Sequence, residues 1–463
     1  MKMKNTVLSA FSLAAAVAFG AEVKVDFNAE KGPVKPVNAV GQPPMIGAPN
    51  GFSMLHYLTE AGLPYSRLHD VGGTYGGFVY VDIPNVFRNF DADETKPENY
   101  DFAFTDKLLK ALDAAGVEPF YRLGVTIENY PEVARYRIDP PKDYAKWARI
   151  CEHVIRHYTE GWANGPKLKI TYWEIWNEAD INPDKEISMM WHADFSEYVN
   201  LYEVTSKHLK KCFPHLKIGG FAGCGFYVAT MKEPTDKSDE RAMKNWLQKV
   251  HHDRCTRDFL AAVRDRKCPL DFFSYHSYAS VEDIMVQIDY CQKLLESYGL
   301  GHVETWLDEW LPRPNRGRLG TAEQASDVAA MLIGMQNSSL WGSCIYDARC
   351  GVSTYSPLFN SFTFKPHKAY YCYTAFNELR KCGTAVAAKT DGTKGLWAAA
   401  AKGPKGAAVM IANNTARAMP LVCDFQGREV LAVRITDADR TDVTVPLPKT
   451  LPAYSFVVVR LFP

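Results

Sequence analysis

The sequence has no excess of charge of either sign. Lysine and arginine together number 53 among its 463 residues, as do aspartate and glutamate, so the formal net charge is zero. Proteins that attract nucleic acid or an anionic membrane surface through their overall charge carry a positive excess. We therefore expect neither of these partners.

After residue 20 the sequence also lacks an apolar segment of the roughly 20 residues that span a bilayer. At the N-terminus, Lys2 and Lys4 precede an apolar run from Val7 to Phe19, which is too short for a membrane anchor. The run leads into Ala18-Phe19-Gly20, whose small first and third residues suit signal peptidase. Residues 1–20 are predicted to be a signal peptide, and the mature protein to be secreted or periplasmic and without a membrane span.

The eleven cysteines form no C-x-x-C pair and no Cys/His spacing typical of a zinc site, so neither a metal nor another cofactor is expected. Export permits disulfides, but an odd number of cysteines leaves at least one thiol free. A chain of this length can fold without disulfides. The pairing of the eleven cysteines stays open.

Short apolar segments alternate with helical patterns over most of the chain. The expected strands are 37–41, 65–70, 117–124, 170–178, 216–223, 271–278, 304–310 and 343–349. The expected helices are 51–61, 105–116, 143–161, 195–212, 256–265, 281–298, 322–337 and 365–380, with a charged, solvated loop-helix excursion at 232–254. Alternating strands and helices indicate a parallel sheet, and eight such units predict a closed (β/α)8 TIM barrel, an α/β fold, over residues 34–382.

The pattern changes near residue 383. From there to residue 463, short β-type runs are divided by Gly, Asn, Asp and Pro, which predicts a C-terminal antiparallel β-sandwich domain. About 80 residues provide few strands for a sandwich. We therefore expect the alternating segment within residues 21–33 to join it.

Several predicted barrel strands end in polar residues, which packing of a barrel core does not require. In a TIM barrel these strand ends meet at one face, where functional groups gather. Other interpretations remain open: His69 as a packed imidazole, Arg67 and Arg122 as ion pairs between strands, and Asp347 with Arg349 as a mutual pair. The residues at the strand ends are Arg67, His69, Asp70, Arg122, Asn177, Glu178, His276, Tyr278, Glu309, Asp347 and Arg349.

Two of these residues are glutamates that close aromatic, apolar runs. Glu178 follows ITYWEIWN, and Glu309 lies in ETWLDEW. A pair of carboxyl groups at the mouth of one barrel suits glycoside hydrolysis, in which one carboxyl donates a proton and the other attacks the sugar or activates water. The ordinary alternative for an Asn-Glu pair is the start of a turn.

The motifs in order along the chain resemble those of clan A glycoside hydrolases. The segments that carry the resemblance are SRLHD (66–70), WEIWNEAD (173–180), FFSYHSY (272–278), DEW (308–310) and KPHKAYYCY (365–373). Within the clan, the chain is most similar to glycoside hydrolase family 39, which contains β-xylosidases and α-L-iduronidases. The resemblance covers nearly the whole predicted mature chain.

The resemblance implies a role for each matching residue. Glu178 would be the acid/base and Glu309 the nucleophile. Asn177 would bind the sugar 2-hydroxyl, Tyr278 would hydrogen-bond Glu309, and His69 and His276 would hold hydroxyls. We expect the pKa of Glu178 to be raised and Glu309 to be ionised, with a cation such as Arg67 nearby. Arg67, Asp347 and Arg349 complete the predicted substrate-binding set.

The chain departs from the family pattern at three positions. Ala179 stands where Pro usually follows Asn-Glu, and Asp308 and Leu311 replace the usual Thr and Asn around Glu-Trp. These departures bear on the substrate more than on the class of reaction.

The predicted function is a retaining exo-glycosidase of β-xylosidase type that needs no cofactor and acts on an oligosaccharide or glycoside. The alternatives are a family 39 enzyme for an α-L-iduronide or an arabinose-containing glycan, and a non-catalytic carbohydrate-binding protein. Iduronidases carry a basic residue at the position of Tyr278, so this tyrosine favours a neutral sugar, although Arg349 could replace the missing charge. A homo-oligomer is possible.

Overall fold

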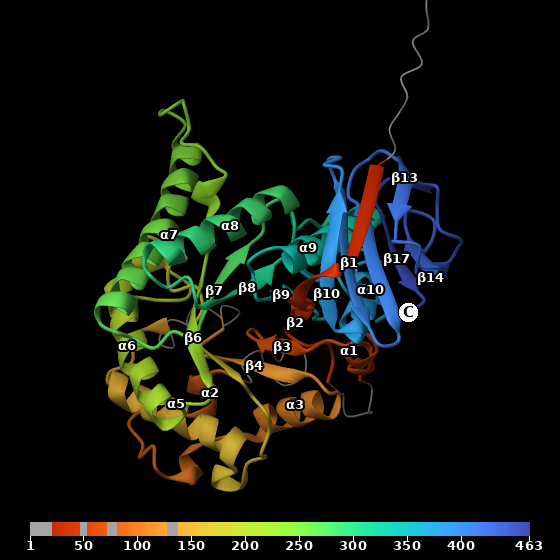
Figure 1. Ribbon diagram of the computed structural model, residues 1–463. Helices are drawn as coiled ribbons and strands as arrows, with labels where there is room; N and C mark the ends of the chain where they lie inside the picture. The colour runs from red at the N-terminus through yellow and green to blue at the C-terminus, as the bar shows by residue number, and fades with distance from the viewer. Residues whose placement is uncertain (1–20, 47–52, 72–80, 127–137) are drawn as a thin grey trace, which may run out of the picture.

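The computed structural model describes residues 21–46, 53–71, 81–126 and 138–463 (Figure 1). The predicted signal peptide at 1–20 and the start of the predicted helix at 51–61 lie outside the described residues. In the described part of the chain, no helix has both the length and the apolar character needed to cross a bilayer.

Eight parallel strands close into a barrel in sequence order, which confirms the predicted (β/α)8 architecture. The barrel closes where β2 pairs with β9 as well as with β3. The strands are β2 (Ala39–Gly41), β3 (Tyr65–Leu68), β4 (Glu118–Leu123), β5 (Tyr172–Ile175), β6 (Lys217–Gly223), β7 (Phe272–Ser277), β8 (Glu304–Trp310) and β9 (Gly342–Ile345).

Helices follow the strands and form the outer layer of the barrel (Figure 1). The α-helices are α1 (His56–Glu60), α2 (Ile83–Val86), α3 (Ala103–Ala114), α5 (Tyr144–Glu160), α6 (Phe195–Cys212), α7 (Glu240–Asp265), α8 (Val281–Ser297), α9 (Ala322–Asn337) and α10 (Tyr370–Cys382). Short 3-10 helices are η2 (Pro97–Asn99), η3 (Trp162–Asn164), η4 (Lys185–Ile187), η5 (Tyr227–Ala229) and η6 (Arg316–Arg318).

Helix α7 is longer than its sequence pattern predicts. It begins at Glu240, inside the charged segment that we expected to be a solvated excursion, rather than near Thr256. The side chain of Asp239 accepts a hydrogen bond from the backbone N–H of Ala242, so an N-cap stabilises the early start. Apolar periodicity missed this part because the first turns of α7 bury little apolar surface.

The second sheet has nine strands in the order β15-β14-β17-β12-β11-β10-β1-β13-β16. One of its ladders is parallel, between β1 and β13, so the sheet is mixed rather than purely antiparallel. Its strands are β1 (Ala21–Pro33), β10 (Thr384–Thr390), β11 (Leu396–Gly403), β12 (Gly406–Asn413), β13 (Met419–Asp424), β14 (Val430–Thr436), β15 (Val443–Thr444), β16 (Thr450–Leu451) and β17 (Ser455–Leu461).

The two faces of this sheet have different partners. Ala399, Met410 and Val458 point toward α9 and α10 and belong to the same apolar core as the barrel. The opposite face, with Val409 and Val457, forms a second core with β1 and β13. Because this second core consists of strand residues apart from Phe425, which follows β13, the sheet covers its own apolar face, as in a sandwich. The sheet therefore packs on the barrel as part of one structure.

Near the starts of the barrel strands, aromatic side chains fill the interior. We call the group of Phe120, Tyr172, Phe272 and Trp306, with the small Ala39 and Cys344, the aromatic plug. The rings of Phe120 and Tyr172 are stacked with centroids 5.1 Å apart, and Trp306 lies 4.9 Å from Tyr172. The plug closes this end of the barrel, so any functional site must lie toward the other end.

Candidate active site

Above the plug, the next inward-facing residue on each of several strands is polar. Side chains two residues apart on a strand point to the same side. The residues that follow the four plug aromatics by two are Arg122, Glu174, Ser274 and Asp308, and all four are fully buried. Ser274 Oγ donates to Glu174 Oε1 at 2.6 Å. The strands thus place a layer of carboxyl groups between the plug and the mouth.

Arg67, from β3, neutralises this layer. Its Nε lies 2.8 Å from Asp308 Oδ2, and its Nη2 lies 2.6 Å from Glu174 Oε2. Burial raises the pKa of Glu174 to about 8 against the charge of Arg67, and Asp308 adds to the rise. The raised pKa favours the protonated form of Glu174, which lowers the negative charge that Arg67 has to balance.

The same guanidinium also orients two residues at the mouth. Arg67 Nη1 lies 2.7 Å from Glu309 Oε1, and Nη2 donates to Asn177 Oδ1 at 2.7 Å. Arg67 is only 1% exposed. Its contacts with Glu309 and Asn177 position both side chains, and the direct substrate contact that we expected of Arg67 stays a prediction.

A β-bulge explains how Glu309 reaches the interior directly after Asp308. Between β7 and β8 the register shifts, because Tyr275 pairs with Leu307 whereas His276 pairs with Glu309. One extra residue on β8 interrupts the strict alternation of sides, so the neighbours Asp308 and Glu309 can both point inward. The bulge thereby adds a carboxyl group to the mouth without removing one from the layer below.

Glu178, Glu309 and His276 meet at the mouth of the barrel. One potential ligand atom of each side chain lies within 4.8 Å of the corresponding atoms of the other two. His276 Nδ1 is 2.7 Å from Glu178 Oε1 and 3.5 Å from Glu309 Oε2. The structure therefore brings together the two glutamates that the sequence singled out, with an imidazole between them.

The backbone that delivers Glu178 is strained. Trp176 and Glu178 have φ values of 73° and 43°, in the left-handed region that costs about 1 to 3 kcal/mol for a residue other than glycine. Two hydrogen bonds hold this turn, from Glu178 N to Ala222 O at 3.0 Å and from Trp176 Nε1 to Met190 O at 2.8 Å. Strain of this kind is concentrated at functional sites.

Tyrosines form one wall beside the glutamates. Tyr278 Oη donates to Glu309 Oε2 at 2.7 Å, as predicted from the sequence. The rings of Tyr278, Tyr346 and Tyr355 meet edge to face, with centroids 5.1 to 6.2 Å apart. Tyr227 Oη accepts from the backbone N–H of Tyr278 at 2.9 Å and fixes its position. Of the three tyrosines, the sequence indicated only Tyr278 as a site residue. Tyr346 and Tyr355, which follow β9, belong to no recognisable motif.

His69 is buried and engaged on both ring nitrogens. Arg122 Nε donates to His69 Nδ1 at 3.1 Å, and His69 Nε2 lies 3.1 Å from Asp70 Oδ1. Burial lowers the pKa of His69 well below its usual value, and Arg122 and Arg67 lower it further. The ring is therefore neutral. His69 Nε2 lies 4.0 Å from Glu309 Oε1, so the ring also borders the mouth.

Asp347 and Arg349, after β9, pair with each other. Arg349 Nε donates to Asp347 Oδ2 at 2.7 Å, and its backbone N–H donates to Asp347 Oδ1 at 3.0 Å. This is the mutual pair that the sequence left open as an alternative. The carboxylate offsets the charge that Arg349 would otherwise offer to a ligand.

The pKa values of His276 and Glu178 differ from expectation. Burial lowers the pKa of His276, but the carboxylates of Glu309, Asp308 and Glu178 outweigh it and raise this pKa well above the usual value. Burial raises the pKa of Glu178, but the charge and hydrogen bond of His276 outweigh it, and the net pKa is lowered. The expected rise in the pKa of Glu178 is therefore wrong, because the raised pKa of His276 places the proton on the imidazole.

The pKa of Glu309 moves the other way. Burial raises it, His276 and Arg67 lower it, and the neighbouring Glu178 raises it again, with a net rise. The charge of Glu178 thus acts directly on Glu309. The two glutamates titrate as an interacting pair, and the proton they compete for lies on the imidazole between them.

A second polar group lies behind Glu178 and was missed by sequence reasoning. The backbone N–H of Cys224, after β6, donates to Asp180 Oδ2 at 3.1 Å. Burial raises the pKa of Asp180 to about 7, and the charge of Glu178 adds to the rise. Lys249 and His252 reach this region from α7. The predicted helix at 256–265 did not include Lys249 and His252, so the sequence offered no reason to place these two residues near Glu178.

The oxygens of Glu178 and Glu309 and the His276 nitrogen could geometrically surround a cation. Two cationic groups compete with such an ion, since Arg67 contacts Glu309 at 2.7 Å and His276 is itself held protonated. The residues present fit acid/base chemistry between carboxyl groups better than metal binding. That the enzyme needs no metal or cofactor stays a prediction.

Comparison with known families adds to this geometry. The family model for glycosyl hydrolases family 39 matches residues 60–306, just over half of the chain. This range includes Arg67, Glu178 and His276, whereas Glu309 lies three residues beyond it.

Two curated relatives are β-xylosidases. The enzyme of Geobacillus stearothermophilus is 27% identical over 233 residues, which is 48% of this chain and 40% of that enzyme. The enzyme of Caldicellulosiruptor saccharolyticus is 25% identical over 225 residues, or 47% and 37% of the two chains. The match thus spans about two fifths of the length of each relative.

Solved structures share the whole fold at low identity. A glucosidase from Croceicoccus marinus has a TM-score of 0.72 at 15% identity, with 96% of this chain and 99% of that chain covered. A monomeric β-xylosidase from Caulobacter crescentus has a TM-score of 0.65 at 15% identity, with the same coverage. These likenesses support the two-part architecture of barrel and sheet.

Proposed function

The chain belongs to glycosyl hydrolases family 39, and from this premise we propose that it is a retaining exo-glycosidase acting on a neutral sugar, most consistent with a β-xyloside. The observation that carries the proposal is the meeting of Glu178, His276 and Glu309 at the barrel mouth, with potential ligand atoms within 4.8 Å of one another. The curated relatives, both β-xylosidases, support the choice of sugar.

The separation of the two carboxyl groups supports retention. Retaining enzymes hold them about 5 to 5.5 Å apart, whereas inverting enzymes leave about 6.5 to 9.5 Å for a water molecule. The approach of Glu178 and Glu309 oxygens within 4.8 Å fits the shorter distance.

In the proposed first step, a Glu309 oxygen attacks the anomeric carbon while the bond to the leaving oxygen breaks. Glu178 gives its proton to that oxygen. In the second step water attacks the same carbon, returns a proton to Glu178 and releases Glu309. Arg67 and Tyr278 orient Glu309, and Asn177 offers its amide N–H to the sugar because Arg67 already occupies the amide oxygen.

The acid must be protonated before the first step, and we propose that His276 supplies the proton. His276 Nδ1 lies 2.7 Å from Glu178 Oε1. When a sugar displaces water from the mouth, a neutral imidazole beside a protonated carboxyl becomes more favourable than a desolvated ion pair. The proton then moves across this hydrogen bond to Glu178.

The preference for a neutral sugar rests on the cations around the mouth. A uronate requires a free positive charge beside its carboxylate. Tyr278 takes the place of the basic residue of iduronidases, and Arg349 is already paired with Asp347 at 2.7 Å. The tyrosine wall offers an apolar surface with hydroxyl groups, which suits a neutral ring.

NMR of the first-formed product tests the stereochemistry. A nitrophenyl β-xyloside should give the β-anomer before mutarotation, and the α-anomer would overturn retention. A parallel screen of nitrophenyl xyloside, arabinoside, glucoside and iduronide tests the sugar. The β-xyloside should have the highest kcat/KM, and a preference for the iduronide would overturn the neutral-sugar proposal.

Azide rescue tests the two roles separately. Glu178→Ala should retain more activity on substrates with good leaving groups and give the β-glycosyl azide from a β-xyloside. Glu309→Ala should be nearly inactive and, with azide, form only the opposite anomer. If Glu309→Ala gave the retained azide instead, the roles of the two glutamates would have to be exchanged.

We further propose that the enzyme works outside the cytoplasm, on the basis of the signal-peptide pattern at residues 1–20. Its partner would be an oligosaccharide or glycoside, and a homo-oligomer stays possible. Sequencing the N-terminus of the protein recovered from culture medium or periplasm would test export, with Ala21 expected as the first residue.

A further inference from the structure

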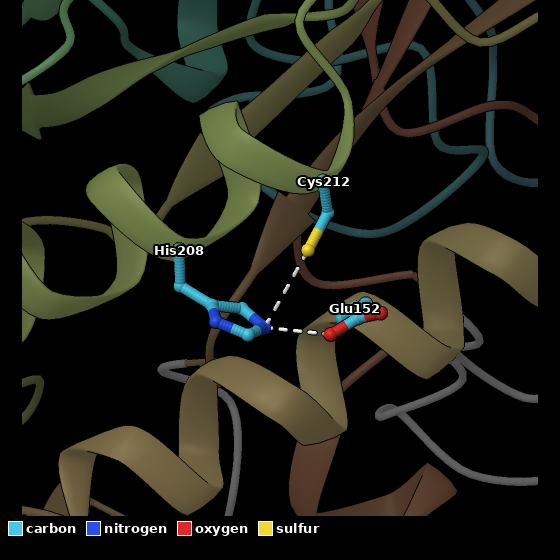
Figure 2. Close-up of side chains that lie close together, drawn as sticks. All are labelled: Glu152, His208 and Cys212. Atoms are coloured by element: carbon cyan, nitrogen blue, oxygen red, sulfur yellow. Dashed lines mark hydrogen bonds and ion pairs between the residues drawn. The ribbon is translucent and has the colours of Figure 1, made fainter.

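Far from the barrel mouth, three side chains with metal-binding atoms meet between two outer helices. Glu152 belongs to α5, and His208 and Cys212 belong to α6 (Figure 2). Residues four apart lie on the same face of a helix, so His208 and Cys212 project together toward α5. The three ligand atoms lie within 4.8 Å of one another.

From this geometry we propose that Glu152, His208 and Cys212 bind a divalent transition metal, best Zn²⁺. Nothing in the proposed glycosidase function requires this site, and the two proposals stand independently. Thiolate, imidazole and carboxylate are the three ligand types that zinc accepts together, with water in the fourth position. Hard cations such as Ca²⁺ and Mg²⁺ prefer oxygen alone, so the sulfur and nitrogen argue against them.

The distance between His208 and Cys212 is close to that of a tetrahedral site, whereas Glu152 lies nearer to His208 than a bound ion would leave it. With metal bonds of about 2.0 to 2.3 Å, neighbouring ligand atoms lie roughly 3.3 to 3.8 Å apart. His208 Nε2 is 3.9 Å from Cys212 Sγ and 2.6 Å from Glu152 Oε2. A small rotation of the Glu152 side chain, which opens its contact with His208, makes room for the ion. On binding, the Cys212 thiol releases its proton to solvent, and His208 binds as a neutral imidazole through Nε2 with its ring proton on Nδ1.

A neighbouring arginine holds the carboxylate in a suitable orientation. Arg156 Nε donates to Glu152 Oε1 at 2.8 Å, which leaves Oε2 directed at His208. The guanidinium packs over the ring of Phe213, 5.1 Å from its centroid. Contacts of this kind orient metal ligands. The charge of Arg156 opposes a cation, so we expect moderate rather than extreme affinity.

The site is accessible to an incoming ion. The side chains of His208 and Glu152 are 30% and 16% exposed, and Cys212 is half-buried. A bound metal would join α5 to α6, the two helices that precede and follow β5, the strand leading to Glu178. Its main effect is therefore expected on stability rather than on the chemistry at the mouth.

Helix α7 offers a matched comparison within the same molecule. His251 and Cys255 have the same spacing of four residues, and Cys255 Sγ lies 3.5 Å from His251 Nε2. Among the described residues, however, this pair belongs to no metal-binding group with a third ligand. Arg254 also contacts His251 Nδ1 at 3.2 Å. The α7 pair thus tests whether a His/Cys pair on a helix is sufficient without the carboxylate.

The experiment uses untagged, chelator-treated full-length protein and titrates Co²⁺ as a spectroscopic substitute for Zn²⁺. We expect one equivalent of Co²⁺ to bind with visible d–d bands and a near-ultraviolet thiolate-to-cobalt band, and Zn²⁺ to remove both. Cys212→Ser should abolish the thiolate band, and His208→Asn should weaken binding at least tenfold. Cys255→Ser and His251→Ala should leave the spectrum unchanged.

The outcomes separate the proposal from its alternatives. Absence of a thiolate band in the wild-type protein would overturn it, as would a band that survives in Cys212→Ser or disappears in Cys255→Ser. Zn²⁺ at 100 times its Kd should raise Tm by about 2 to 4 °C in the wild type and not in Cys212→Ser. Hydrolysis of a nitrophenyl xyloside by Cys212→Ser should be unchanged, so loss of metal binding and failure of the glycosidase proposal are distinguishable.

Discussion

The two ends of the barrel use the same strands for opposite purposes. At the strand starts, the aromatic plug buries rings that contact one another at about 5 Å. Two residues after the plug aromatics, β5 and β8 bury Glu174 and Asp308, and the neighbouring β3 buries Arg67. Burial of the plug rings stabilises the folded state. Burial of the charged layer destabilises it by desolvation, and the ion pairs offset this cost only partly.

The difference indicates where stability and function reside in this molecule. Conformational strain at Trp176 and Glu178 and the buried carboxyl groups all lie toward the mouth. Such features persist only when surrounding structure holds them in place. We infer that the plug end supplies rigidity to the mouth, and mutations at the two ends should separate folding from catalysis.

The largest effect is expected at the mouth and on activity alone. Glu309→Gln should lower kcat by about 10⁴-fold or more, because it removes the proposed nucleophile. Arg67 retains Glu174 and Asp308 as partners, so thermal unfolding should change little. Steady-state kinetics with a nitrophenyl xyloside and a melting curve measure both. If Glu309→Gln were inactive because it is unfolded, the proposed separation between activity at the mouth and stability at the plug would be wrong.

The reverse outcome is expected at the plug. Trp306→Ala should destabilise the protein by about 3 to 5 kcal/mol, because Trp306 is fully buried against Tyr172 and Phe120. Urea denaturation measures the loss, and Trp306→Phe should recover much of it. Below the transition, kcat per folded molecule should stay within about twofold of wild type. A large fall in kcat for a folded Trp306→Ala protein would contradict the proposed separation.

Removing one buried charge near the mouth should stabilise the protein in a pH-dependent way. The folded pKa of Asp180 is about 7, above its usual unfolded value of about 3.9. The folded state therefore binds more protons between these values, and its stability falls as pH rises from about 4 to 7. Asp180→Asn removes this loss.

Relative to wild type, Asp180→Asn should gain about 2 kcal/mol of stability between pH 5 and pH 8. Asparagine keeps an oxygen that can accept the N–H of Cys224, so the backbone contact survives. Denaturation curves at the two pH values provide the measurement. An equal effect at both pH values would mean that Asp180 is not protonated in the folded protein at low pH.

The smallest effect is expected in the tyrosine wall. Tyr278→Phe removes the 2.7 Å hydrogen bond to Glu309 and should lower kcat roughly tenfold without loss of stability. Tyr355→Phe is the matched control, because its ring contacts Tyr278 at 5.1 Å but its hydroxyl makes no hydrogen bond to a described residue. Equal rates for the two variants would show that the ring matters and the hydroxyl does not.

Local patterns predicted most of the fold and the two central residues. Each barrel strand is a short apolar run, and Glu178 and Glu309 mark the ends of β5 and β8. These signals lie within a few neighbouring residues, so they can be read directly. The aromatic residues of the plug, such as Trp306, were visible as strand residues, although their meeting in one layer was not.

What escaped prediction depends on contacts between distant segments. The inward position of both Asp308 and Glu309 requires the register shift on β8, which leaves no mark in composition. The location of the site's proton on His276 depends on three carboxylates, two on β8 and one after β5. The proposed metal ligands were missed because Glu152 lies 56 residues before His208, and no spacing rule covers a site shared by two helices.

The position of β1 in the second sheet means that this strand is synthesised long before the strands with which it pairs. β1 precedes every other described strand, yet it pairs with β10 and β13, and Glu22 N–H donates to Asp391, 369 residues away. At a synthesis rate of about 5 to 20 residues per second, roughly 20 to 70 s separate the emergence of the two partners from the ribosome. Throughout that interval the apolar side chains Val23, Val25 and Phe27 have no sheet to cover them. In a newly made chain, proteases and chaperones can therefore reach β1 before the barrel is complete.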